Sequence, residues 1–171
     1  TMEIAERVAI DARDADFFSV DFHLFFATLC EEEGDFDQGV EQARKALALG
    51  PDDPVACNFL GYVLADHNRS LSEADGLITK ALAAQPDNEA YLDSLAWVRF
   101  RQGRFAEAHE TMSAAIRQGL SHLDAVIFDH AGDIAAAVGL EVLARWYWEE
   151  ALAGEAPNRE DVRRKLGLPD S

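Results

Sequence analysis

Small residues recur along the chain at an almost constant interval. The first series consists of Ala12, Ala46, Ala81, Ala115 and Ala151, with steps of 34, 35, 34 and 36 residues. Two more series of alanine and glycine keep nearly the same interval. They are Ala5, Gly39, Ala74, Ala108 and Ala144, and Ala27, Gly61, Ala96 and Gly132. Small side chains are needed where helices cross closely, so the pattern predicts an all-α solenoid of stacked antiparallel helix pairs.

Apolar and small residues fall three and four positions apart, without the alternation typical of strands, so no sheet is expected. We expect one domain over residues 1–171, with repeats at 20–53, 54–88, 89–122 and 125–157. Residues 2–16 carry small residues at second-helix positions. We interpret them as the second helix of a truncated preceding repeat, in a piece of a longer array. Residues 158–167 are expected to form a C-terminal capping helix.

Several helix starts carry capping signals, in which a polar side chain accepts a hydrogen bond from a free backbone amide. They are Asp35 with Gln38, Ser70 with Glu73, Asp53 before Pro54, and Asn158 with Asp161.

Acidic residues dominate the charge of the chain. It has 32 acidic and 15 basic residues and a formal net charge of −17. Phosphate backbones and anionic lipid surfaces would be repelled, so nucleic acid is not expected as a partner. No stretch approaches the length of an apolar membrane span, so direct membrane insertion is not expected either. The acidity is typical of a solvated surface, although it also suits basic ligands.

No recognised catalytic or cofactor motif is present: there is no Gly-rich phosphate loop, no G-x-S-x-G and no H-E-x-x-H. We therefore expect no enzyme activity and no cofactor. Asp129, His130 and Asp133 invite a metal interpretation, but His130 is rotated by about 100° from Asp129 on a helix, and no metal site is predicted. Cys30 and Cys57 occupy apolar positions and are expected to behave as small hydrophobic residues, with their pairing left open.

At these positions the chain resembles the tetratricopeptide repeat family, whose pattern is W-x2-L-G-x2-Y, then A-x3-F, then A and P. Repeat two keeps Leu60-Gly61, Ala74, Ile78, Ala81 and Pro86, and repeat four keeps Gly132, Ala144, Trp148 and Ala151. The resemblance implies a right-handed superhelix. Segments 58–62, 90–97 and 129–133 resemble bacterial tetratricopeptide adaptor proteins that are often exported or lipid-anchored. That resemblance implies a cell-envelope setting, and a cytoplasmic one stays open.

In this family the first helix of each repeat lines the concave side of the superhelix. The resemblance therefore predicts a partner-binding face that combines aromatic and polar side chains. Its residues are Asn58, Tyr62, Asp93, Trp97, Phe100, Asp129 and Asp133. Aromatic side chains offer contact area, and carboxylates would steer a partner with Lys or Arg. The predicted function is a non-catalytic scaffold or adaptor that binds a peptide segment or a protein partner in this groove.

Structural roles compete with binding at several of these positions. Trp97 could be core, and Asn58 could bond between adjacent first helices. The three aspartates are expected to face solvent or to pair with Arg101 or Arg99, because unpaired buried carboxylates are costly.

Two further features carry an expectation about their burial. The Arg99 stem is expected to pack while its head reaches solvent or a carboxylate, with contact to an acidic ligand as the alternative. Trp146 or Tyr147 should be covered by the capping helix, and either one, if bare, would mark a contact patch.

Two other functions remain open. The chain could be a structural module that self-associates, as a homo-oligomer, through the truncated N-terminal edge. The residues of that edge are Ala5, Val8, Ala9, Phe17 and Phe18. A regulatory domain of an enzyme is the other alternative.

Overall fold

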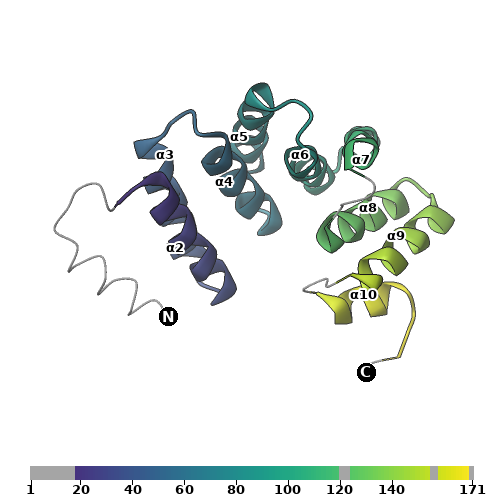
Figure 1. The fold of residues 1–171 in the computed structure, drawn as a ribbon. Coiled ribbons are helices and arrows are strands. Elements are labelled where there is room, and N and C mark those ends of the chain that lie inside the picture. The colour runs from purple at the N-terminus through teal and green to yellow at the C-terminus, as the bar shows by residue number, and fades with distance from the viewer. Residues whose placement is uncertain (1–17, 120–123, 155–157, 170–171) are drawn as a thin grey trace. The chain divides into compact units, whose positions relative to one another are not determined.

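The computed structural model describes residues 18–119, 124–154 and 158–169, and these residues form helices and turns without any strand. The all-α helix-pair fold predicted from the sequence is confirmed (Figure 1). The chain divides into two compact units, one within residues 1–85 and the other within residues 86–171. The predicted second helix at residues 2–16 lies outside the described residues.

Unit 1 contains two helix pairs. They are α2 (Val20–Glu32) with α3 (Phe36–Leu49), and α4 (Pro54–Asp66) with α5 (Leu71–Ala84). Each pair packs along its length, and α3 also packs against α4. The joint is apolar, since Leu24, Ala46 and Ala56 form one buried cluster in it.

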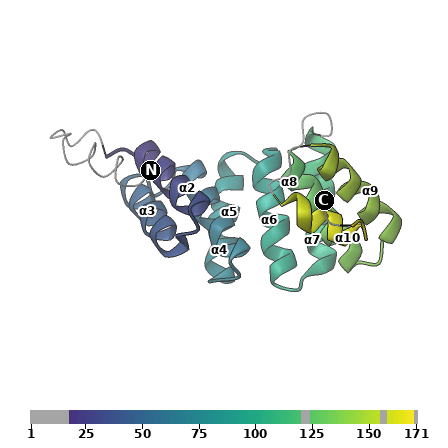
Figure 2. The same ribbon diagram turned by 90° about the horizontal axis from the view of Figure 1, so that it is seen from below.

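Unit 2 contains two further pairs and a short last helix. They are α6 (Glu89–Arg101) with α7 (Phe105–Gly119), α8 (Ala125–Ala137) with α9 (Glu141–Ala153), and α10 (Arg159–Lys165). Contacts of α8 with α6 and α7 join the two pairs, and α10 packs against α9, as Figure 2 also shows. The helix expected at residues 158–167 is therefore present as α10.

Every described alanine and glycine of the three series is buried. The glycines show why size matters at these crossings. An ideal Cβ added to Gly61 would lie 2.5 Å from Cγ1 of Ile78, a fully buried side chain of α5. At Gly132 the same atom would overlap the indole of Trp148. The periodic small residues are therefore the points at which the helices of a pair touch backbone to side chain.

The turns inside the pairs need left-handed backbone. Gly34, Gly103 and Gly139 supply it with φ values of +78°, +77° and +78°. The pair α4–α5 has Asn68 and Ser70 in positive φ instead. Left-handed Ser70 makes no capping hydrogen bond, so the predicted Ser70–Glu73 capping box is wrong.

The other capping predictions have mixed outcomes. Asp53 precedes Pro54 and accepts from the Ala56 amide at 2.8 Å, and Asp35 accepts from the Gln38 amide at 3.2 Å, as expected. Asn158 stands at the start of α10 but makes no cap bond. Its side chain bonds to α8 instead, so this capping prediction is wrong.

The contact at Gly61 makes a testable prediction. We expect Gly61→Ala to destabilise the protein by about 1–3 kcal/mol, because the new methyl overfills a packed crossing. Gly76→Ala is the matched control: it lies in α5 with nothing within 4 Å of its added Cβ, and should gain up to about 1 kcal/mol from helix propensity. Urea unfolding of both variants measures the difference. Equal effects of the two alanines would contradict the crossing-point interpretation.

Candidate functional site

The first predicted site residues lie on α4 in unit 1. Asn58 and Tyr62 are both half-buried there, one turn apart. The carbonyl oxygen Oδ1 of Asn58 is buried and has no hydrogen-bond partner in the described part of the chain. A buried acceptor left in this state costs about 1–3 kcal/mol, so it is an unusual feature that a donor could relieve. The expected bond between first helices is not made by this oxygen.

In unit 2, Asp93 of α6 is buried and bonded to His130 of α8. Its carboxylate oxygens lie 2.9 Å and 3.2 Å from Nδ1 of His130, and both side chains are less than a tenth exposed. The expectation that Asp93 faces solvent or pairs with an arginine is therefore wrong. A buried carboxylate needs a partner, and the neighbouring first helix supplies it.

The rings beside this pair form a stack. The His130 ring lies parallel to Trp97, with centroids 4.1 Å apart, and Trp97 lies parallel to Phe100, at 5.0 Å. Trp97 is only 7% exposed, which matches its alternative role as a core residue. Phe100 is half-buried and packs against the core cluster of unit 2. The expected aromatic strip is thus largely internal in this unit.

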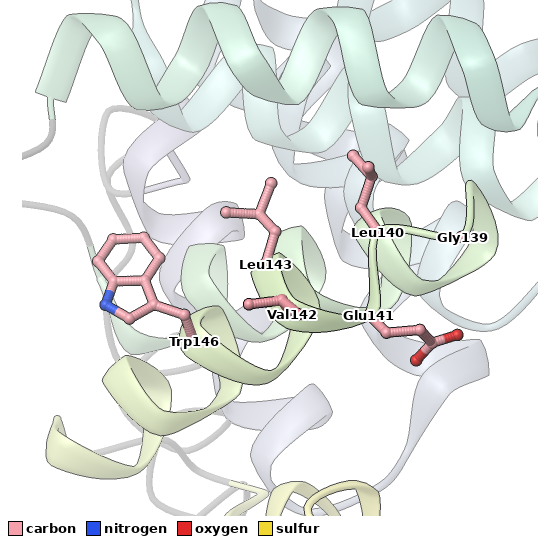
Figure 3. A pocket seen from close by; sticks show the side chains of 6 residues that line it. All are labelled: Gly139, Leu140, Glu141, Val142, Leu143 and Trp146. Atoms are coloured by element: carbon pink, nitrogen blue, oxygen red, sulfur yellow. The ribbon is translucent and has the colours of Figure 1, made fainter.

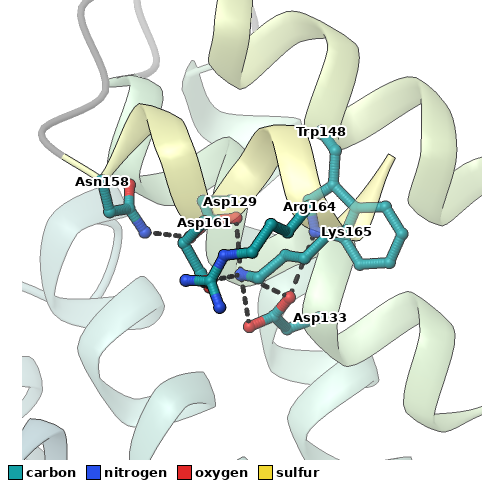
Figure 4. A network of polar contacts seen from close by, with 7 residues as sticks. All are labelled: Asp129, Asp133, Trp148, Asn158, Asp161, Arg164 and Lys165. Atoms are coloured by element: carbon teal, nitrogen blue, oxygen red, sulfur yellow. Dashed lines mark hydrogen bonds and ion pairs between the residues drawn. The ribbon is translucent and has the colours of Figure 1, made fainter. Parts of the chain in front are cut away.

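Asp129 and Asp133 share one lysine (Figure 4). Nζ of Lys165, on α10, lies 2.8 Å from a carboxylate oxygen of each. Asn158 also donates to Asp129, at 2.6 Å, and the Trp148 indole donates to Asp133, at 3.1 Å. These carboxylates therefore neither face solvent nor pair with Arg99 or Arg101, and that expectation is wrong for both.

Burial and charge act in opposite directions on this network. Burial raises the pKa of Asp133, and the hydrogen bond and charge of Lys165 offset only part of that effect. Burial alone would lower the pKa of Lys165, but its contacts with Asp129 and Asp133 outweigh burial and raise the pKa. The ammonium group is therefore held in its charged form, and it compensates two carboxylates that water reaches poorly.

The two arginines near this face are used inside the unit. The Arg99 head donates to the hydroxyl of Thr111 on α7, a contact that the sequence pattern did not predict. Its Nε is buried without a hydrogen-bond partner among the described residues. The Arg101 guanidinium lies over the Trp97 ring, 5.5 Å from its centroid, which is a cation–π arrangement.

The capping helix covers less of α9 than expected. Val162 and Leu166 of α10 pack with Trp148 and Phe128. Tyr147 is half-buried, but Trp146 remains 42% exposed.

Neither a metal-ligand group nor a membrane-spanning helix is found among the described residues. No group of three or more His, Cys, Asp or Glu side chains converges there as metal ligands, and no described helix could cross a membrane. Cys30 and Cys57 are both buried, and burial raises the pKa of the Cys57 thiol. The Cys57 thiol is therefore a poor nucleophile.

Sequence reasoning missed the partners of the buried acids, although a signal was present. His130 follows Asp93 by 37 residues, and Lys165 follows Asp129 by 36. In unit 1 His67 follows Glu31 by 36 residues, and their Nε2 and Oε2 atoms lie 3.0 Å apart. An acid and a basic residue about one repeat apart therefore predict a bond between neighbouring helix pairs.

Comparisons with known proteins show which proteins resemble this chain. No protein-family model matches the chain. A curated relative, the TPR repeat-containing protein PA4667 of Pseudomonas aeruginosa, is 36% identical over 104 residues, which are 60% of this chain and 18% of the relative. The chain thus spans less than a fifth of that relative's length.

Solved structures show the same fold at low identity. The pilF protein of Pseudomonas aeruginosa is 22% identical with a TM-score of 0.67, over 86% of this chain and 65% of that one. MamA of Desulfovibrio magneticus is 15% identical with a TM-score of 0.67, over 92% and 85%. Helix pairs, small-residue register and the curated relative together show a fold like that of tetratricopeptide repeat proteins. Repeats of this class are in general non-catalytic protein-interaction scaffolds.

The lysine shared by two aspartates makes a testable prediction. Lys165→Met should lower the free energy of unfolding by about 1–3 kcal/mol, because it leaves two poorly hydrated carboxylates without their cation. Arg164→Met, on the same helix, removes a cation from its ion pair with Asp161, whose side chains are 68% and 42% exposed. It should change the free energy of unfolding by less than about 0.5 kcal/mol. Chemical unfolding of both variants at neutral pH provides the comparison.

The same pair of variants predicts a pH dependence. Because the folded-state pKa of Lys165 is raised, its contribution is complete below the ordinary lysine value of about 10.4 and is lost as the pH rises through the folded value. The stability difference between wild type and Lys165→Met should therefore shrink at strongly alkaline pH. A difference that is constant across that range would show that the ammonium charge is not what holds α10.

Proposed function

We propose that the chain is a non-catalytic scaffold that holds a peptide segment of a partner protein on the first-helix faces of its repeats. The repeat fold and the curated relative support the general role. The observation that carries the finer proposal is the docking of α10 on α8. There two first-helix side chains, Asp129 and Asp133, already hold a helical segment through one basic residue.

The positions of Asp129 and Asp133 relative to the small residue of their helix have equivalents in unit 1. Asn58 and Tyr62 stand three residues before and one residue after Gly61, as Asp129 and Asp133 do around Gly132. Both are half-buried, so part of each side chain remains accessible. The Tyr62 ring would give contact area, and the exposed part of the Asn58 side chain would lie beside it.

The contribution of unit 2 is smaller than the sequence suggests. Asp93, Trp97, Asp129 and Asp133 are engaged within the unit, so we assign them to holding its helices together. Phe100 keeps a partly exposed ring and is the contact residue that we propose there. A preference for basic partners then rests on the net charge of −17 rather than on these aspartates.

One observation favours the alternative of self-association. In unit 1, Phe25 on α2 is 62% exposed and Phe18, which precedes α2, is 39% exposed, so two aromatic side chains are partly open to solvent there. The other residues named for this edge, Ala5, Val8, Ala9 and Phe17, lie outside the described residues. An upstream repeat or a second copy could cover the exposed rings.

Site-specific photo-crosslinking tests the binding proposal. A benzophenone amino acid placed at Tyr62 or at Phe100 should give crosslinked partner adducts in cells that make the protein. The same group at Leu49, an exposed apolar residue of the second helix α3, is the matched control and should give none of these adducts. Mass spectrometry identifies the adducts. Equal adducts at all three positions, or none at 62 and 100, would reject the first-helix faces as the binding surface.

Sedimentation velocity tests the alternative. If α2 forms a contact between copies, the wild-type chain should show a mass that rises with concentration, and Phe25→Asp should abolish the rise by burying a charge in that contact. Val55→Asp, at another exposed apolar position of unit 1, is the control and should leave the mass unchanged. A monomer at all concentrations would reject self-association through this helix.

A further inference from the structure

The first half of α9 carries an open apolar hollow in unit 2. Its volume is about 670 Å³, and its lining includes Leu140, Val142, Leu143 and Trp146. Figure 3 shows Leu140, Leu143 and Trp146 pointing to one side of the helix, while the Glu141 carboxylate points away. Val142 is 88% exposed, which is unusual for a branched apolar side chain. Because α9 is the second helix of its pair, this surface is separate from the first-helix faces proposed above.

Comparison between the repeats shows that the exposed set belongs to this repeat alone. Aligned on Gly39, Ala74, Ala108 and Ala144, the three other repeats have no large apolar side chain at the four positions. At the position of Leu140 they carry Asp35, Ser70 and Arg104, and at that of Val142 they carry Asp37, Ser72 and Ala106. At the position of Leu143 they carry Gln38, Glu73 and Glu107, and at that of Trp146 they carry Glu41, Gly76 and Glu110.

The reverse exchange occurs at the first residue of the same helix. There the other repeats carry Phe36, Leu71 and Phe105, whereas this repeat carries Glu141. The pattern of apolar and polar residues is thus inverted over the start of α9. Packing inside the unit does not require the inversion, because the substituted side chains are mostly exposed.

The inversion has a structural cost. Leu140 occupies the N-cap position of α9, which has no side-chain capping hydrogen bond, whereas Asp35 caps α3 at the equivalent position. The Trp146 ring is nevertheless held in place, since it lies edge-to-face with Phe128 at 6.2 Å and against Tyr147 at 5.0 Å. A positioned, half-exposed tryptophan is the kind of side chain that anchors protein interfaces.

We propose that this surface of α9, formed by Leu140, Val142, Leu143 and Trp146, docks a short amphipathic segment of a partner protein whose apolar anchors are flanked by Lys or Arg. Size favours a segment over a second folded copy. Four side chains on two helical turns fall far short of the roughly 800 Å² per partner that a standard interface buries.

Charge favours the same occupant. The chain has a net charge of −17, so two copies repel each other, whereas flanking cations are attracted. Glu141 at the edge of the hollow is exposed and can receive such a cation.

The test uses two short synthetic peptides in amphipathic helical order, one of leucine and lysine and one of leucine and glutamate, each with a fluorescent label. Anisotropy should show saturable binding of the leucine–lysine peptide to the wild-type chain. The double variant Val142→Asp plus Trp146→Glu, which introduces the residues of repeat one, should bind it about tenfold or more weakly. The matched control, Val55→Asp plus Leu49→Glu, adds the same charge at exposed apolar positions of unit 1 and should bind as wild type does.

Because both double variants add two negative charges, a purely electrostatic attraction would strengthen binding in both. The proposal is therefore overturned if the α9 variant binds as tightly as the control, or if the wild type shows no saturable binding. Equal binding of the leucine–glutamate peptide would overturn the assignment of a basic partner. A wild-type dimer in sedimentation that the α9 variant dissociates would assign the surface to a second copy instead.

Discussion

Close approach of helices at small residues is the constraint on which this structure depends. Where α4 crosses α5, Gly61 leaves room for Ile78, and where α8 crosses α9, Gly132 leaves room for the Trp148 indole. Each large side chain fills space that the opposite small residue does not use, so the two must stay in register. The same close approach occurs in every pair, because each pair is one copy of the same repeat and buries apolar surface by packing against its neighbours.

Carboxylates join the helix pairs of this acidic chain. Glu31 with His67, Asp93 with His130, and Asp129 with Lys165 each connect an acid to a basic group about one repeat further along. A buried carboxylate is tolerated only when a cation or hydrogen-bond donor compensates it, and the repeat spacing delivers that donor from the next helix layer. The aspartates of α6 and α8 are thereby committed to the fold, and the accessible part of the first-helix face is carried by Asn58, Tyr62 and Phe100.

Residues that depart from the repeat pattern can give this protein a binding surface that the other repeats lack. The small residues at the helix crossings recur in every pair, because the helices of each pair must approach closely there. The start of α9 is free of that constraint, and apolar residues stand there at positions where the other repeats carry mostly polar ones. Exposed apolar area is unfavourable in water, and the lost cap of α9 adds to the cost, so stability does not account for the exchange. We attribute the exchange to contact with another molecule.

The amino-acid sequence by itself determined the helix pairs, their turns and the buried small residues, because helix periodicity, capping and crossing distances are local or strictly periodic. It also placed Asp53 and Asp35 as caps. The partners of Asp93, Asp129 and Arg99, the loss of the Ser70 cap and the exposure of Trp146 were decided by the tertiary structure. Those outcomes depend on which side chain of a neighbouring helix comes within about 3 Å, and hydrogen bonding is too short-ranged for a pattern of residue types to specify it.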